Sequence, residues 1–218
     1  LRVLTGSPAC CWTRCRRRAW LDRHGDDQLR LYTAHRTLQL DDQQRSFVAL
    51  MAKKPGHGLQ ACEQGEGGVV GLRLRSTTRD GLAVEAHPAL LQRREGASRW
   101  GRFVYRPVLA RQGRRLTREH RLQLALAGRL LERLQQAPVT DGLALAGSGR
   151  RLERETVPLG GGLQHQLDES LSKLAADLSR PIPPALAADR RTRTSCSWRG
   201  VCNADAAREG HPSQASGI

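Results

Sequence analysis

The sequence has no long apolar segment and few acidic residues for its size. No apolar run approaches the roughly 20 residues that a transmembrane helix needs, and the first residues, LRVLTGSPACCWTRCRRRAW, lack the apolar core of a signal peptide. We therefore expect a soluble, cytoplasmic protein that does not use a membrane as partner. The chain begins without methionine and stops in mid-pattern, which suggests a piece of a longer product.

Basic side chains outnumber the acidic ones. The 218 residues contain 36 Lys and Arg against 21 Asp and Glu, a formal net charge of +15. Such a surface attracts polyanions, and nucleic acid is the commonest of them. Arginine dominates the basic set, which also agrees with codon bias in a GC-rich genome. A scaffold protein whose charge has no binding role therefore stays an alternative.

The length fits one sizeable domain with a small appended part. We divide the chain into an N-terminal cysteine-containing segment, residues 1–36, and an α/β core, residues 37–180. A proline-rich linker and a second cysteine segment, residues 181–218, follow the core. The last segment is expected to be truncated.

Apolar spacing predicts the elements of that core. The expected strands form a meander of three and then two shorter strands: 69–75, 82–93 with an interruption at Pro88, 103–111, 142–146 and 151–157. The expected helices lie before, between and after these strands: 40–52, a long helix after the N-cap Thr117, and 162–178. This order predicts a mixed central sheet flanked by helices.

The six cysteines gather at the two ends of the chain. Cys10, Cys11 and Cys15 lie near the start, Cys196 and Cys202 lie near the end, and Cys62 stands alone. This is not the spacing of a secreted disulfide framework. In a cytoplasmic chain it favours ligands that hold the two ends around a metal centre. Cys62 is expected to be a buried small hydrophobic residue.

Five segments of the chain match the motifs of one protein family in order and spacing: TRCRRRAWLDRHGD around Cys15, HPALL at 87–91, YRPVLAR at 105–111, RLQLALAGRLLE at 121–132 and RTSCSWRGVC at 193–202. In these segments and in element order the chain resembles the RecB-like nucleases of the PD-(D/E)XK superfamily, in the branch with a C-terminal iron-sulfur cysteine cluster. The resemblance implies a restriction-endonuclease-like αβββαβ core and the metal-dependent cleavage of DNA.

The resemblance places the family's two metal-binding carboxylates and its lysine at Ala89, Leu109 and Arg111. Alanine and leucine supply no oxygen ligand for Mg²⁺, and arginine does not act as a general base at neutral pH. We expect neither a catalytic residue nor Mg²⁺ here. Glu85 and His87 share the strand parity of Ala89, but Glu85 would lie about 13 Å away along an ideal strand.

Positive charge persists beside these positions. The expected nucleic-acid-binding residues run from the third strand into the long helix: Arg111, Arg114, Arg115, Arg118, Arg121 and Gln123. Gln123 matches a glutamine of the family's helix motif. Because the strand end and the helix start would converge on the groove where nuclease substrates lie, we expect these arginines to contact phosphates. The alternative is a solvated helix face.

The family's four cluster cysteines fall on Cys15, Arg193, Cys196 and Cys202. A [4Fe–4S] cluster normally takes four thiolates, so we expect any iron-sulfur cluster to be substoichiometric or unstable. Four alternatives stay open: a fourth ligand from Cys10 or Cys11, a three-cysteine cluster with an open iron, zinc held by the three cysteines and His24, or loss of the centre.

The resulting hypothesis is a catalytically degenerate RecB-like domain that binds nucleic acid, DNA first of all, or docks on other DNA-processing proteins. Two alternatives remain. One is an active Mg²⁺-dependent DNA nuclease with relocated carboxylates. The other is a structural scaffold domain of a DNA-processing complex. Whether the chain is an enzyme stays open at this point.

Overall fold

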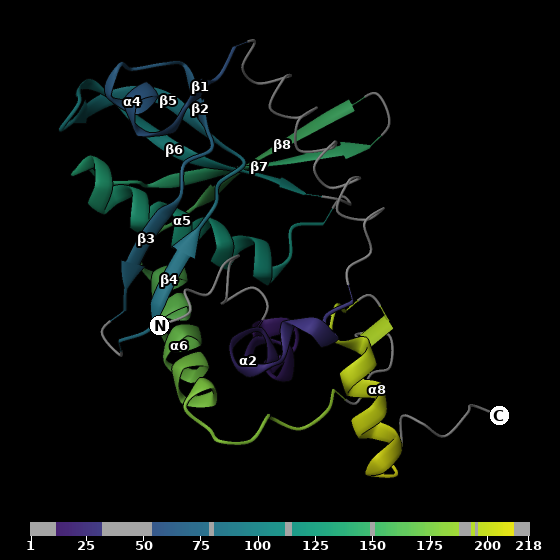
Figure 1. Cartoon of the computed structure of the whole chain (residues 1–218). Helices are drawn as coiled ribbons and strands as arrows, with labels where there is room; N and C mark the ends of the chain where they lie inside the picture. The colour runs from purple at the N-terminus through teal and green to yellow at the C-terminus, as the bar shows by residue number, and fades with distance from the viewer. Residues whose placement is uncertain are drawn as a thin grey trace.

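A computed structural model shows a mixed six-stranded sheet with helices packed on it (Figure 1). It describes residues 12–31, 54–78, 81–111, 115–148, 151–187, 193–194 and 196–211. In spatial order the strands are β1 (Gly56–His57), β2 (Gly68–Val70), β5 (Leu90–Ser98), β6 (Gly101–Arg111), β7 (Asp141–Ser148) and β8 (Arg151–Pro158). The pairs β1–β2 and β6–β7 are parallel, and the other neighbours are antiparallel.

The first two strands expected from the sequence are each broken in two. Residues 69–75 form β2 and β3 (Leu74–Thr77), and residues 82–93 form β4 (Ala83–Ala86) and β5. The strands β3 and β4 pair as a separate two-stranded sheet, yet they keep the offset of β2 and β5. The pairing of the meander and its interruption at Pro88 were therefore predicted correctly, and the break at Gly71 was not predicted.

The breaks have local causes. Gly71 has a φ of +72°, which favours glycine, and a side chain there would collide with the ring of His57. On the opposite strand Pro88 has no backbone N–H to give to a ladder. The hairpin is consequently interrupted at the same level on both strands.

The long helix α5 (Arg118–Gln135) begins where the sequence predicts. The Thr117 hydroxyl accepts a hydrogen bond from the His120 N–H at 3.4 Å, and Nδ1 of His120 accepts one from the Thr117 N–H at 3.2 Å. This is a capping box with histidine in the third position. The helix joins β6 to its parallel neighbour β7 and buries a row of leucines against the sheet.

Alternate residues of the sheet face its two sides. Leu91, Tyr105 and Leu109 belong to the main core that α5 covers. Leu90 and Val108 lie opposite each other on β5 and β6 and belong to a separate buried group on the other face. Since both faces are apolar, the centre of the sheet is buried on both sides.

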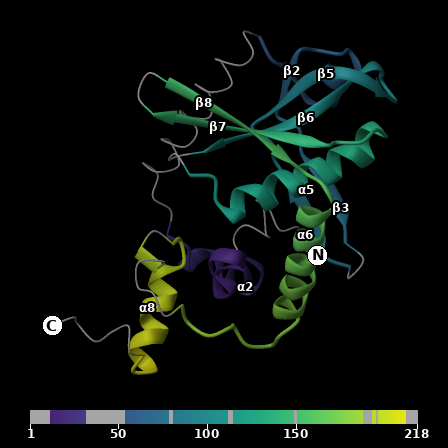
Figure 2. The same cartoon turned by 180° about the vertical axis from the view of Figure 1, so that it is seen from behind.

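The helix α6 (Gly161–Leu178) packs on α5, and its far end contacts α2 (Arg16–His24). Both views place α2 between α6 and α8 (Arg199–Arg208) (Figures 1 and 2). The buried carboxylate of Asp177 accepts hydrogen bonds from Arg16 Nε at 2.6 Å and from Trp12 Nε1 at 2.7 Å. The bond from Arg16 keeps the pKa of Asp177 below its usual value although burial opposes it.

Two short helices complete the described structure, the 3₁₀ turn η1 (Asp27–Leu29) and α4 (Gly58–Glu63). The strands expected at 142–146 and 151–157 and the helix expected at 162–178 are confirmed as β7, β8 and α6. The helix expected over 40–52 lies outside the described residues. Within the described residues, no helix combines the length and the apolar character that a bilayer span requires.

Candidate functional site

One of the positions that the resemblance assigns to the active site, Leu109, lines a small cavity. Gln123 of α5 lines it too, together with Pro88, the residue before Ala89. The Ala89 N–H donates to the carbonyl oxygen of Val108 at 3.1 Å. Ala89 and Leu109 are each only 9% exposed. Ala89 therefore lies next to the residues that line this cavity, and Arg111 is not among them.

The residues present do not fit Mg²⁺. No residue that lines this cavity is acidic, whereas Mg²⁺ is normally held by carboxylate oxygens and water. The cavity measures about 10 Å³, enough for a single water molecule. Gln123 and His87 are its polar side chains, and the rest of the lining is apolar. We derive no metal-dependent step from this site.

Glu85 forms hydrogen bonds with two basic neighbours. Its carboxylate is fully buried and accepts hydrogen bonds from Arg75, its partner on β3, and from His87. Burial raises the pKa of Glu85, but the two hydrogen bonds and the charges behind them outweigh burial and lower it. The predicted strand parity of Glu85 and Ala89 does not apply, because β4 ends at Ala86 and the two residues do not lie on one continuous strand.

The arginines around the start of α5 are exposed wherever the structure describes them. Arg115, Arg118 and Arg121 form this set, which we call the α5 arginine edge. Arg121 lies 3.4 Å from Glu155, and both side chains are more than 40% exposed. Exposed pairs of this kind are weak and leave an arginine available to a stronger anion.

The remaining members of the predicted set are placed less completely. Arg111 is the last residue of β6 and lies opposite Ala146 of β7, while its side chain is outside the described residues. Arg114 is outside them altogether. Gln123 lies one helical turn beyond the start of α5 and faces the small cavity.

The cysteine positions at the two ends of the chain come together beside α2. Cys15 is the N-cap of α2, Cys202 lies within α8, and the Cys196 N–H donates to the carbonyl oxygen of Arg193 at 2.9 Å. Burial raises the pKa of Cys202 to about 11; the charge of Arg17 lowers it, and the thiols of Cys196 and Cys15 raise it further. The three thiols are thus close enough to influence one another.

These residues do not make up a four-thiolate set. Arg193 is buried at the position of the fourth family cysteine, and Cys10 and Cys11 lie outside the described residues. Nε2 of His24 lies 2.8 Å from the carbonyl oxygen of Leu178. Within the described part of the chain, no group of three or more His, Cys, Asp or Glu side chains is arranged to hold a metal ion.

Direct polar and apolar contacts join the same two segments, residues 12–31 and 193–211, which we call the terminal clasp. The guanidinium of Arg17 forms a buried ion pair with Asp205 and donates to the carbonyl oxygen of Pro184 at 2.9 Å. The indole of Trp198 is fully buried and donates to Asp22 at 2.7 Å. Sequence reasoning considered the cysteines in this region and missed these contacts.

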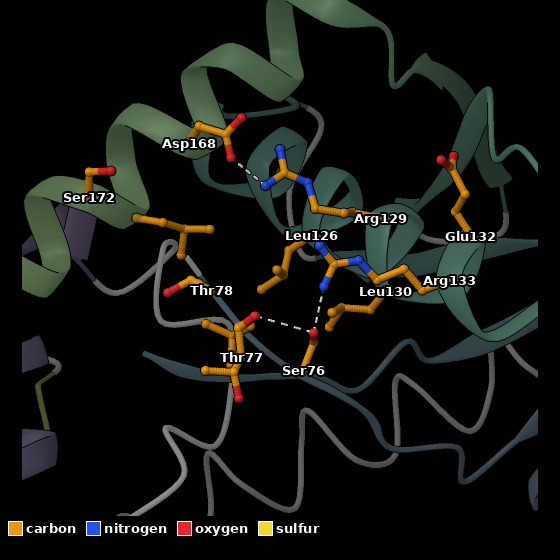
Figure 3. Close-up of a pocket in the computed structure, with 12 residues that line it drawn as sticks. Ser76, Thr77, Thr78, Leu126, Arg129, Leu130, Glu132, Arg133, Asp168 and Ser172 are labelled. Carbon is orange, nitrogen blue, oxygen red and sulfur yellow. Dashed lines mark hydrogen bonds and ion pairs between the residues drawn. The ribbon is translucent and has the colours of Figure 1, made fainter. Parts of the chain in front are cut away.

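A second, larger cavity of about 450 Å³ lies between β3, α5 and α6 (Figure 3). Ser76, Thr77 and Thr78 line one side of it, arginines of α5 line the other, and the Ser76 hydroxyl accepts a hydrogen bond from Arg133. The sequence offered no signal for this site, because Ser76 and Arg133 are 57 residues apart and no known motif links them.

No protein-family model and no curated protein sequence matches this chain. Among solved structures, the crystal structure of SSO0001 is similar, with a TM-score of 0.56 and 11% sequence identity. The match covers 90% of this chain and 84% of that chain. At this identity the similarity concerns the fold alone, and it agrees with a mixed α/β architecture over nearly the whole chain.

Proposed function

We propose that this chain is a RecB-like domain of the PD-(D/E)XK type that binds nucleic acid through the α5 arginine edge and does not cleave it. The observation that carries the proposal is the small cavity beside Ala89, Leu109 and Gln123. It lies at a position that the resemblance assigns to the family's metal site, Leu109, and no acidic side chain lines it. A domain built this way keeps the shape of the nuclease without its metal ligands.

Topology supports the family part of the proposal. β2, β5 and β6 form an antiparallel set of three, and α5 then leads to β7, which is parallel to β6. This is the βββαβ order of the expected core. The segments that carry the resemblance fall on matching places, since HPALL spans the break before β5, YRPVLAR ends β6 and RLQLALAGRLLE lies within α5.

Charge supports the binding part. Contacts to phosphate need only positive groups within reach and carry no direct sequence information. Arg115, Arg118 and Arg121 supply three exposed guanidinium groups at the entrance to α5. We therefore expect binding with little sequence preference.

The purified chain is expected to show no metal-dependent cleavage of single- or double-stranded DNA in Mg²⁺ or Mn²⁺. The reason is the lack of a carboxylate in the cavity. The matched variant carries Ala89→Asp, Leu109→Glu and Arg111→Lys, and we expect Mg²⁺ to raise its melting temperature, because the ion now has ligands in the folded state. Cleavage by the unmodified chain that EDTA abolishes would contradict this part of the proposal.

The α5 arginine edge is expected to set the salt dependence of DNA binding. Log affinity should fall with log salt by about 0.9 per neutralised phosphate on duplex DNA. Replacing Arg115, Arg118 and Arg121 with glutamine should make that slope shallower by roughly two to three units. Fluorescence anisotropy over a salt series measures it.

The control variant carries the same change of charge at the opposite end of β6, with Arg94, Arg99 and Arg102 replaced by glutamine. These three arginines are exposed on the β5–β6 hairpin. An equal reduction of the salt slope in the two triple variants would mean that DNA binding depends on the net charge of the chain and not on the α5 arginine edge. No binding even at low salt would favour the scaffold alternative.

A further inference from the structure

The cavity between β3, α5 and α6 combines an apolar surface with a basic one, as a binding site for an amphipathic anion would. Its floor is apolar and is formed by Val84, Leu126, Leu130 and Leu171. The Ser76 hydroxyl of β3 and guanidinium groups of α5 lie beside this floor (Figure 3). A volume of about 450 Å³ is within the range of small-molecule sites.

The charges that line the cavity are not equivalent. Arg129 is held by α6, because it donates to the Gln164 side chain at 2.8 Å, to the Gln164 carbonyl oxygen at 3.1 Å and to the carboxylate of Asp168. The carboxylate of Glu132 accepts a hydrogen bond from the Val139 N–H at 3.1 Å, beyond the end of the helix. Both acidic side chains of the lining therefore already have partners.

Arg133 differs from Arg129. Its Nη1 donates to the neutral hydroxyl of Ser76 at 2.6 Å, and within the described residues it forms no ion pair. Figure 3 shows its guanidinium turned toward Ser76 and Arg129 turned away toward Asp168. One end of the cavity thus presents a positive charge next to the hydroxyl of Ser76.

We infer that this cavity binds a small organic phosphate, with the phosphate on Arg133 and the Ser76 hydroxyl and the organic body over the leucine floor. A phosphate has several acceptor oxygens and can accept from a guanidinium and a hydroxyl together. The apolar floor favours a ligand that also carries a hydrophobic or planar part. This inference does not rest on the proposed function.

Isothermal titration calorimetry on the intact chain tests it with three probes, AMP, UMP and ribose 5-phosphate. We expect at least one of them to bind, and the same compound without its phosphate to bind at least about tenfold more weakly. Arg133→Gln should weaken phosphate binding by about tenfold to a hundredfold, the effect of losing a charged hydrogen-bond partner. Ser76→Ala should weaken it by about threefold to tenfold.

The controls locate the site. Arg102→Gln removes an exposed arginine outside the cavity and should bind the probe like the unmodified chain, while the glutamine triple variant of the α5 arginine edge should lose DNA binding and keep probe binding. Failure of all three probes, or unchanged binding by a folded Arg133→Gln variant, would overturn the inference. Inorganic phosphate that binds as tightly as the best probe would refute the role of the leucine floor.

Discussion

Replacing Asp205 with alanine is expected to lower the free energy of unfolding of the terminal clasp by about 3–5 kcal/mol. The side chains of Arg17 and Asp205 are 6% and 14% exposed, so the variant leaves a buried cation whose remaining hydrogen bond goes to the Pro184 carbonyl oxygen. An uncompensated buried charge costs more than the loss of the attraction itself. Urea denaturation, together with hydrogen exchange of α2 and α8, measures the effect.

A double variant separates the pair from its burial. Arg17→Met with Asp205→Leu removes both charges and fills the space with apolar atoms, so stability should return to within about 1 kcal/mol of the unmodified chain or exceed it. Arg208→Gln is the matched control, because Arg208 also contacts Asp205 but is 73% exposed; its effect should stay below about 1 kcal/mol. A loss below 1 kcal/mol for Asp205→Ala would mean that water reaches Arg17.

Trp198→Ala is expected to destabilise the clasp by about 3–5 kcal/mol, the usual result of removing a buried aromatic side chain. Trp198 is fully buried and packs with Leu21, Leu186 and Ala206 in a small core of its own. Thermal unfolding followed by tryptophan fluorescence and hydrogen exchange of the clasp would measure the loss.

Two further substitutions separate packing from hydrogen bonding at the same place. Trp198→Phe keeps a ring but loses the 2.7 Å bond to Asp22, and should cost about 1–3 kcal/mol. Gly25→Ala should cost about 1–3 kcal/mol by overpacking, since a methyl group there would lie 2.6 Å from the indole ring. Ile182→Ala, at an exposed residue, should change stability by less than about 0.5 kcal/mol. If Trp198→Ala lowered the free energy of unfolding by less than about 0.5 kcal/mol, the terminal clasp would have no packed core.

The elements with strong local signals were predictable from the sequence. Thr117 and the leucines spaced by four residues fixed the start and the buried face of α5, and the strand over 103–111 emerged as β6. Local signals also misled. Gly71 was treated as tolerated within a strand, whereas it interrupts the hairpin at the same level as the predicted interruption at Pro88. Whether a glycine or proline ends a strand depends on its partner strand, which local sequence does not contain.

The candidate site was predictable only as far as the family resemblance extends. It singled out Leu109 and Gln123, and both residues line the small cavity. It did not reveal that Arg75 and His87 form hydrogen bonds with the Glu85 carboxylate. It also did not reveal that Arg133 of α5 donates to the Ser76 hydroxyl of β3. Such contacts depend on how distant segments pack, and a single sequence carries no signal for them.

The terminal clasp also determines when α2 can pack against its partners during translation. Arg17 and Asp205 are 188 residues apart. At about 5–20 residues per second, a ribosome needs about 10–40 s to make the intervening chain. During that interval α2 has left the exit tunnel while its partners on α6 and α8 are incomplete or absent. Leu21, which the finished clasp buries, is then open to chaperones and to neighbouring nascent chains.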